Sequence, residues 1–454
     1  MAIHYEKALS AGRLRPFQWA TFLVCMLVLI GDGIDLQLLG LVAPVIIADW
    51  GVDRGSFGWA MSAALVGMGL GAWIGGTVGD RIGRRNALAG AALVFGLATL
   101  AASTADTLVE MTAYRLVGGL GFGAAFPNSL ALASEWLPER WRSYAITTLS
   151  VGTPAGGAVA AALAPDLLAA YGWRGTFVVF GASTLLLIVL ILGILKDSPP
   201  FLAAKGQQAR ARKFARKVTD EELIFDAPKA QEASPETAPS TDIGVFHATN
   251  RRLNSGVSIG FAASTLVAYG VISWGTTFLT AAGLTLEQAL TTSFAVGITS
   301  IAGALAAGFL ARHFGSKAVM LGVSIVLLVL VVAAGAMVEV FRVSPSPAVR
   351  LAIQALIASI SGIVSVGIAT IYVMMTLGYS QSCRSAGIGF GMMTGRLGAI
   401  VASFGGGFLI DLGNGSLVPF FIAMAIGAIL VSAAAFIVDI HVQPARVQAR
   451  ALAG

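Results

Sequence analysis

The sequence predicts an all-α polytopic membrane protein with twelve transmembrane helices in two halves of six. Of its 454 residues, 56% are hydrophobic and only 11% are charged, whereas soluble domains carry roughly 25% charged residues. Apolar runs of about 20 residues, which suffice to cross a hydrocarbon core of about 30 Å, recur along almost the whole chain. One long polar segment interrupts these runs near the middle. Together these observations exclude a soluble globular fold.

Twelve apolar runs can be counted between short polar breaks. The first is too long for the apolar region of a secretory signal and lacks a small-residue cleavage site, so we expect a permanent helix. The runs begin near Phe17, Ser56, Asn86, Thr107, Ser143 and Arg174, and then near Asn254, Glu287, Lys317, Val349, Ser385 and Ser416. The predicted organisation is a tail (1–17), a bundle (18–195), a linker (196–253), a second bundle (254–439) and a tail (440–454).

The basic residues predict the orientation of the chain. If both termini are cytoplasmic, 23 of the 29 lysines and arginines lie on that side and four lie outside. This asymmetry is a strong positive-inside signal. Anionic lipid of the inner leaflet is a sufficient partner for the net charge of +6, so no nucleic acid is expected. In the linker, a basic cluster (205–217) precedes a segment with the composition of a disordered chain. The cluster reads as a solvated charge run or an amphipathic helix on the inner leaflet.

The two halves repeat one another. "GTVGDRIGRRNAL" from Gly76 follows the second run, and "GFLARHFGSKAVM" from Gly308 follows the eighth. A second pair aligns "RSYAITTLSVGTPAGG" from Arg142 with "RSAGIGFGMMTGRLGA" from Arg384. Repeats at matching topological positions are typical of transporters that place the substrate between two halves and alternate its access.

Two carboxylates interrupt the first apolar run, in "VLIGDGIDLQLLG". Asp32 and Asp35 are three residues apart, so a helix places them on one face. They lie about 21 Å and 25 Å along that helix. A charge at such depth is costly, so this face should meet a cavity or a partner rather than lipid. Gly31 and Gly33 flank Asp32 and allow a bend or a close helix approach.

Two arginines are predicted to lie inside the membrane. Arg115 in the fourth run matches the depth of Asp35 and can pair with it. Arg396 lies near the midplane of the eleventh run, and no acid in the second-half spans matches its depth. A carboxylate of the substrate is a suitable partner for its planar guanidinium. Permanent pairing of Arg115 with Asp35, and backbone carbonyl partners for Arg396, stay open as alternatives.

Several of these motifs resemble a known family. "GTVGDRIGRR" resembles the loop between the second and third helices of the major facilitator superfamily, and "RLVGGLGFGAAFPN" from Arg115 is similar to its fourth-helix pattern. "DGIDLQLLGLVAP", "GWRGTF", "KDSPPFL" and "RSAGIGFGMMTGRLGAI" narrow the resemblance to aromatic acid:proton symporters. It implies proton-coupled uptake, by alternating access across the bacterial inner membrane, of benzoate, a hydroxybenzoate or a phenylpropionate.

The mechanism expected from these residues couples a proton to the carboxylate. A desolvated carboxyl near a second carboxylate binds a proton more readily, whereas an adjacent arginine favours the ionised form. We therefore expect Asp32 to carry the proton and Asp35 to stay ionised, while Arg396 or Arg115 binds the substrate carboxylate. Apolar and aromatic walls should hold the ring. The candidates are Phe126, Asn128, Trp274, Phe278, Tyr372 and Phe390, although for each of them alone helix packing or a place in the interfacial belt is expected more than substrate contact.

A cytoplasmic gate is predicted where charges and glycines cluster in the loops. Charge networks that form only when this side is closed can hold one state of the carrier. The candidates are Gly76, Asp80, Arg81, Gly83, Arg84, Arg85, Glu135, Arg142 and Arg384. A plain topology signal with an ordinary turn is the alternative reading.

Other functions are less consistent with the sequence. None of the four histidines lies deep in a span, so neither a metal site nor a cofactor is expected, and no nucleophile suggests an enzyme. A facilitator or exporter of another small organic anion on the same fold stays possible, because it would not need Asp32 to exchange a proton. We expect a monomer.

Overall fold

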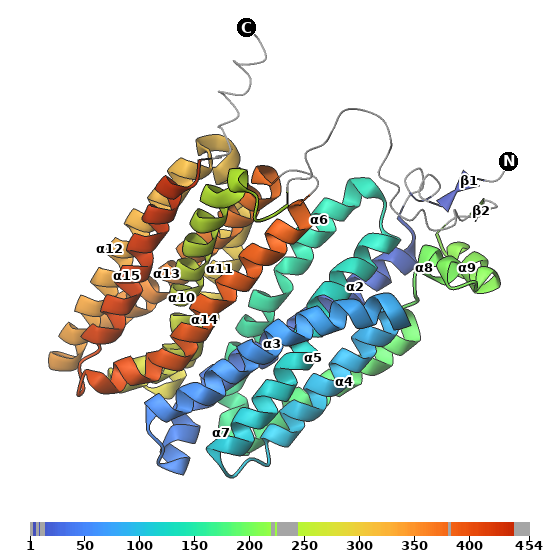
Figure 1. Cartoon of the computed structure of the whole chain (residues 1–454). Helices are drawn as coiled ribbons and strands as arrows, with labels where there is room; N and C mark the ends of the chain where they lie inside the picture. The colour runs from blue at the N-terminus through green and yellow to red at the C-terminus, as the bar shows by residue number, and fades with distance from the viewer. Residues whose placement is uncertain are drawn as a thin grey trace, which may run out of the picture.

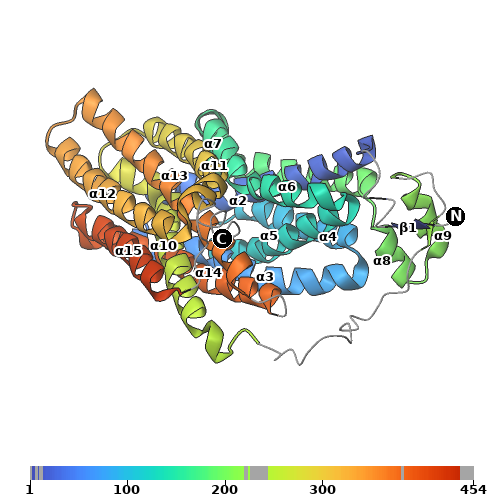
Figure 2. The same ribbon diagram turned by 90° about the horizontal axis from the view of Figure 1, so that it is seen from above.

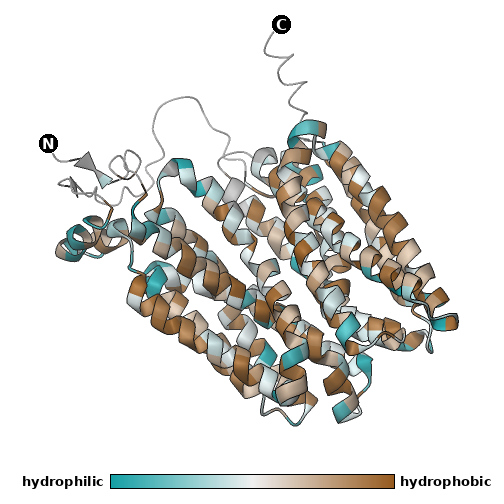
Figure 3. Ribbon diagram, turned by 180° about the vertical axis from the view of Figure 1, so that it is seen from behind, coloured by the Kyte–Doolittle hydropathy of each residue, from teal (hydrophilic) through white to brown (hydrophobic). Residues whose placement is uncertain are grey.

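The computed structural model describes residues 3–5, 9, 14–218, 223–224, 244–379 and 383–439, apart from the side chains of residues 3, 4, 139, 143, 147, 223, 224, 377 and 384–386. In this part of the chain, long helices form two halves that lie side by side (Figure 1). Apolar residues cover most of their length, and hydrophilic residues gather toward the helix ends and on the short helices α8 and α9 (Figure 3). This distribution is that of a membrane-spanning bundle.

The first half contains the helices before the linker. Their bounds are α2 Pro16–Trp50, α3 Arg54–Ile82, α4 Arg84–Ala102, α5 Leu108–Trp136, α6 Glu139–Ser150 and α7 Gly152–Ile194. Local signals explain several boundaries. The Asp53 side chain caps α3 by accepting a hydrogen bond from the Ser56 amide, and Thr107 and Glu110 form a capping box at the start of α5.

The fifth and sixth spans form one nearly continuous helical segment made of α6 and α7. Eleven helical segments of the described residues are long and apolar enough to cross a membrane, and one of them, Arg140–Ile194, is 55 residues long. The chain breaks inside it at Gly172, whose φ of 64° and ψ of −176° are not helical. Such a φ is readily adopted only by glycine. The 55-residue segment therefore crosses twice, which gives the twelve predicted spans.

The second half repeats the first in its packing. Its helices are α10 Arg251–Ala281, α11 Leu286–Phe314, α12 Ser316–Val343, α13 Pro347–Gly378, α14 Arg384–Leu412 and α15 Val418–Ile437. In the first half α3 packs against α5 and α2 against α7, and the corresponding pairs, α11 with α13 and α10 with α14, pack together in the second. The internal repeat of the sequence is thus a repeat of helix pairs.

The beginning of the linker carries two short helices, α8 (Pro199–Ala204) and α9 (Gln208–Ala215), which pack on each other. From above they lie beyond the edge of the first half (Figure 2). A short parallel pair, β1 (Ile3–His4) and β2 (Leu223–Ile224), and the turn η1 (Ala248–Asn250) complete the described elements. α2 begins and α15 ends at the same end of the bundle as this linker, which we call the linker end (Figure 1).

The halves meet closely at the opposite, distal end, where α2 ends and α3 begins. There the start of α3 lies beside the end of α14 (Figure 1). Arg54 forms an ion pair with Asp411 at 2.9 Å, and the Gly55 amide donates a hydrogen bond to the same carboxylate at 3.1 Å. The Thr276 hydroxyl of α10 donates to the Gly40 carbonyl of α2. These three contacts join the halves toward the distal end.

Candidate functional site

The expected pairing of Asp35 with Arg115 is present inside the first half. The guanidinium donates to both carboxylate oxygens, at 3.1 and 3.3 Å, and to the Asp35 carbonyl at 3.3 Å. The Thr99 hydroxyl of α4 donates to the same carboxylate at 2.5 Å, and the Phe177 ring faces the guanidinium at 5.3 Å. Arg115 is 1% and Asp35 5% exposed. The sequence reading did not include Thr99, whose only signal is a hydroxyl on a helix rich in alanine.

Asp32 occupies a different environment although it lies one turn away on α2. Its side chain is 0% exposed, and neither carboxylate oxygen has a hydrogen-bond partner among the described residues. The sequence suggested a cavity or a partner for this face, and Asp32 has no partner in the described part. Next to it, the close helix approach expected of Gly33 is present, because this glycine packs on the backbone of Thr153 in α7. Two acids on one helix face thus differ in their neighbours.

Arg396 is the second intramembrane cation, on α14. It is half-buried, and among the described residues it makes no hydrogen bond or ion pair. Its charge acts on the hydroxyl of Tyr372 in α13, which is also influenced by Tyr269 in α10. The Tyr372 ring packs edge-on against Phe261, with 5.3 Å between the ring centres. A guanidinium and two phenols from three helices of the second half are therefore near enough to interact electrostatically.

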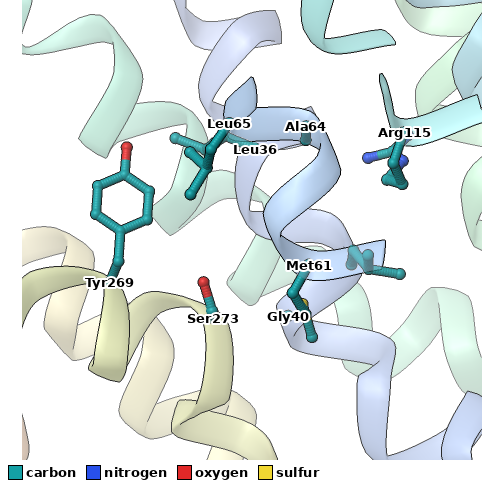
Figure 4. Close-up of a pocket in the computed structure, with 9 residues that line it drawn as sticks. Leu36, Gly40, Met61, Ala64, Leu65, Arg115, Tyr269 and Ser273 are labelled. Atoms are coloured by element: carbon teal, nitrogen blue, oxygen red, sulfur yellow. The ribbon is translucent and has the colours of Figure 1, made fainter. Parts of the chain in front are cut away.

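A small pocket lies between the two halves (Figure 4). The first half contributes an apolar wall from α2 and α3, with Arg115 behind it. The second half contributes the hydroxyl-bearing side chains Tyr269 and Ser273 of α10. Tyr269 was not among the residues selected from the sequence, because a single aromatic in an apolar helix carries no distinguishing pattern. The lining residues are Leu36, Leu39, Gly40, Met61, Ala64, Leu65, Arg115, Tyr269 and Ser273.

The other residues considered for the ring lie in helix packing. The Asn128 amide donates to the carbonyls of Gly75 at 2.9 Å and Ala124 at 2.8 Å, which joins α5 to α3. The Trp274 indole is fully buried and donates to the Ser403 carbonyl at 3.0 Å. The remaining three pack elsewhere: Phe278 against Phe420 and Phe421, Phe126 against the core of the first half, and Phe390 against Phe246. The structure brings only Tyr372 close to a buried cation.

At the linker end, a charge network joins three helices of the first half. The Arg84 guanidinium pairs with Asp80 at 2.7 Å and with Glu135 at 3.0 Å. Because Asp80 and Glu135 lie in the last turns of α3 and α5 and Arg84 begins α4, the network fixes the turn at Gly83. That glycine has a φ of 96°, which an L side chain rarely adopts.

Asp197, directly after α7, extends this network. It is 8% exposed and accepts a hydrogen bond from the Arg85 amide at 3.1 Å, in the first turn of α4. Burial raises the pKa of this carboxyl, against the opposing effects of the Arg85 amide and charge. The Arg85 guanidinium donates to the Leu192 carbonyl at 2.5 Å. Asp197 was missed as a site residue although it lies in the "KDSPPFL" motif, because nothing local ties it to a loop over a hundred residues earlier.

The remaining gate candidates lie toward the linker end of the bundle. Arg81 is exposed, and Gly76 has no neighbour close to where a side chain would extend. Arg142 donates to the Leu137 carbonyl at 3.1 Å. The side chain of Arg384 lies outside the described part. A latch between the halves at this end stays a prediction.

Comparisons with known proteins agree with this arrangement. A family model described as Major Facilitator Superfamily matches residues 22–376. The chain is 30% identical to the 4-hydroxybenzoate transporter PcaK of Acinetobacter baylyi over 446 residues, which cover 96% of this chain and 93% of the relative. It is also 30% identical to a gallate transporter of Pseudomonas putida, with 88% of each chain covered. These relatives are named as transporters, not as enzymes.

Solved structures support the same fold. The partially occluded, inward-open xylose transporter XylE from E. coli superimposes with a TM-score of 0.69 at 16% identity, covering 94% of this chain and 98% of that one. The family match spans most of the chain, and the helices form two packed six-span halves. The chain therefore belongs to the Major Facilitator Superfamily and is a multi-pass protein of the inner membrane.

Proposed function

We propose that the protein is a proton-coupled symporter that takes up an aromatic carboxylate, such as benzoate, a hydroxybenzoate or a phenylpropionate, by alternating access. The observation that carries this proposal is Arg396, a half-buried guanidinium near the middle of α14 with no partner among the described residues. An unpaired buried charge is costly, so a site of this kind favours an anionic ligand. The transporters of 4-hydroxybenzoate and gallate named among the relatives support an aromatic acid as that anion.

Arg396 is the better carboxylate receptor of the two buried arginines. Arg115 already donates to Asp35 from both terminal nitrogens, so a substrate would have to displace a buried ion pair. Arg396 can present two parallel N–H donors to a carboxylate, with Tyr372 beside it. We therefore assign substrate binding to Arg396 and a structural role to the Arg115 pair.

Asp32 is the candidate proton carrier. Its oxygens are occluded and unpartnered in the described part, and burying an ionised carboxylate without partners costs far more than burying the neutral acid. Asp32 would hold a proton in this closed position and release it when movement of the halves admits water. Asp35, with Arg115 and Thr99 as donors, has the partners that an ionised carboxylate needs.

Uptake into proteoliposomes tests this function. Purified protein would be reconstituted, and accumulation of labelled 4-hydroxybenzoate measured with an inward proton gradient and after an uncoupler. We expect accumulation that the uncoupler abolishes. Asp32→Asn should lose accumulation but keep exchange across the membrane without a gradient, and Arg396→Gln should lose both. Accumulation by Asp32→Asn at the level of the unmodified protein would contradict the proton assignment.

A facilitator or exporter on the same fold is the second candidate. A facilitator equilibrates the anion without a gradient, so the uncoupler would change neither the rate nor the final level, whereas an exporter would move the anion outward and not accumulate it. No observation among the described residues favours this reading over symport. The same proteoliposomes, loaded inside with unlabelled substrate, distinguish exchange from net uptake.

A further inference from the structure

Tyr269 lies where the two halves meet. It belongs to α10 of the second half, and its ring packs against a cluster formed by Leu65 and Met68 of α3, Phe122 of α5 and Ala399 of α14. It also lines the pocket of Figure 4, where its ring extends from α10 into the space that faces α2 and α3. In transporters built from two repeats the substrate site lies near the midplane where the halves meet, so a residue in this position can border that site.

The hydroxyl of Tyr269 is polar and unpartnered. Among the described residues it makes no hydrogen bond, and it is not one of the occluded polar atoms that Asp32 exemplifies. By contrast, Ser273 one turn further along α10 is bonded to the Ser403 hydroxyl at 2.7 Å, and Tyr379 at the linker end donates to Asn254 at 2.6 Å. A tyrosine hydroxyl away from water usually has a hydrogen-bond partner. The Tyr269 hydroxyl has none among the described residues, so it is available to bind a ligand.

The position relative to Arg396 suggests what that ligand group is. Tyr269 packs against a cluster that includes Ala399 of α14, and Ala399 lies one helical turn from Arg396 on the same helix, so the guanidinium and the Tyr269 ring belong to one short stretch of the second half. A benzoate whose carboxylate is bound at Arg396 would extend its ring along this stretch. Apolar Leu36 and Leu65 face the ring side, and the Tyr269 hydroxyl is the polar group available to a ring substituent.

We propose that Tyr269 is a specificity-determining residue whose hydroxyl hydrogen-bonds a polar substituent on the aromatic ring and so favours hydroxylated over unsubstituted aromatic acids. This proposal rests on the transport function proposed above. A site built to pair with a substrate hydroxyl rejects the analogue that lacks it, because its own polar group is then left unpaired. A residue that only seals the contact between the halves would use its ring and not its hydroxyl.

Substitution of the hydroxyl alone separates these roles. Tyr269→Phe keeps the ring and its packing, and Tyr269→Leu removes both. Tyr171→Phe is the matched control, since that tyrosine is 64% exposed on α7, far from the pocket. Binding of benzoate and of 3- and 4-hydroxybenzoate to the purified protein would be measured by titration calorimetry, with melting temperature as a check on folding.

We expect the unmodified protein and Tyr171→Phe to bind at least one hydroxybenzoate more tightly than benzoate. In Tyr269→Phe this preference should fall about two- to twelvefold, which corresponds to one neutral hydrogen bond, while benzoate affinity is kept. An unchanged preference in a folded Tyr269→Phe would overturn the proposal and leave the transport function standing. Absence of binding of all three acids to the unmodified protein would overturn the Tyr269 proposal, and absence of phenylpropionate binding as well would overturn the transport function.

Discussion

The two acids of α2 differ in their hydrogen-bond partners, and this difference is set by neighbouring helices and not by their spacing in the sequence. Asp35 has Arg115 and Thr99 as donors, whereas Asp32 has none among the described residues. The spacing of three correctly predicts one helix face. It cannot tell which acid meets the cation, because the cation comes from a helix some 80 residues later.

Removing one member of the buried pair should be costly. Asp35→Asn would leave the Arg115 charge buried without its counter-ion, so we expect a loss of about 3–5 kcal/mol of stability and a clear drop in melting temperature in detergent. The double variant Asp35→Asn with Arg115→Gln should recover part of this loss, because no uncompensated charge remains.

The exposed pair Asp106 and Arg174 is the matched control. These side chains meet at 2.8 Å and are 80% and 41% exposed, so Asp106→Asn should cost at most about 1 kcal/mol. Equal destabilisation by Asp35→Asn and Asp106→Asn would show that the buried pair contributes no more than a solvated one.

Among the elements, the contact between α2 and α7 depends on a glycine. A β-carbon at Gly33 would overlap the backbone of Thr153, whereas one at Gly31 would meet only the Leu187 side chain, at 3.2 Å. Small residues let membrane helices approach at this distance. The flanking glycines of Asp32 therefore have unequal roles, which the symmetrical pattern Gly-Asp-Gly does not reveal.

Alanine at these two positions should give different results. Gly33→Ala forces α2 away from α7, so we expect a cost of about 1–3 kcal/mol as in an overpacked core and slower transport. Gly31→Ala requires only a small movement of a leucine and gains helix propensity, so its melting temperature should stay close to that of the unmodified protein. Equal melting temperatures of the two variants would contradict the different packing roles assigned to Gly31 and Gly33.

For the whole molecule, the distal contact fixes the present conformation. Arg54 and Asp411 join the halves at 2.9 Å, and the Gly55 amide adds a hydrogen bond at the start of α3. With the hydrogen bond from Thr276 to Gly40, these contacts close the chain at this end. With the orientation that the basic residues predict, the closed end faces outward.

Loss of the distal ion pair should shift the carrier toward the state open at this end. The two side chains are 37% and 34% exposed, so the pair is worth at most about 1 kcal/mol. Arg54→Gln should therefore raise the population open at the distal end by no more than about fivefold. Distances between spin labels on the outer ends of α3 and α14 would report this population.

A control comes from an ion pair within one half. Arg342 pairs with Glu339 at 3.2 Å and has similar exposure, but Arg342→Gln breaks no contact between the halves and should leave the label distances unchanged. The charge exchange Arg54→Asp with Asp411→Arg should restore the closed population. A shift of equal size in Arg342→Gln would mean that the effect is not specific to the distal contact.

The sequence alone determined the solvent, the number of spans and the two halves, because the length and polarity of a segment decide whether it crosses a bilayer. It also predicted that Arg115 could meet Asp35, since both depths follow from helix rise. The tertiary structure decided which polar groups have no hydrogen-bond or ion-pair partner among the described residues. They include the Asp32 carboxylate, the Arg396 guanidinium and the Tyr269 hydroxyl where the two halves meet. Thr99 and Asp197 are far in the sequence from the groups they contact. The hydropathy of a helix does not predict which other segments pack beside it.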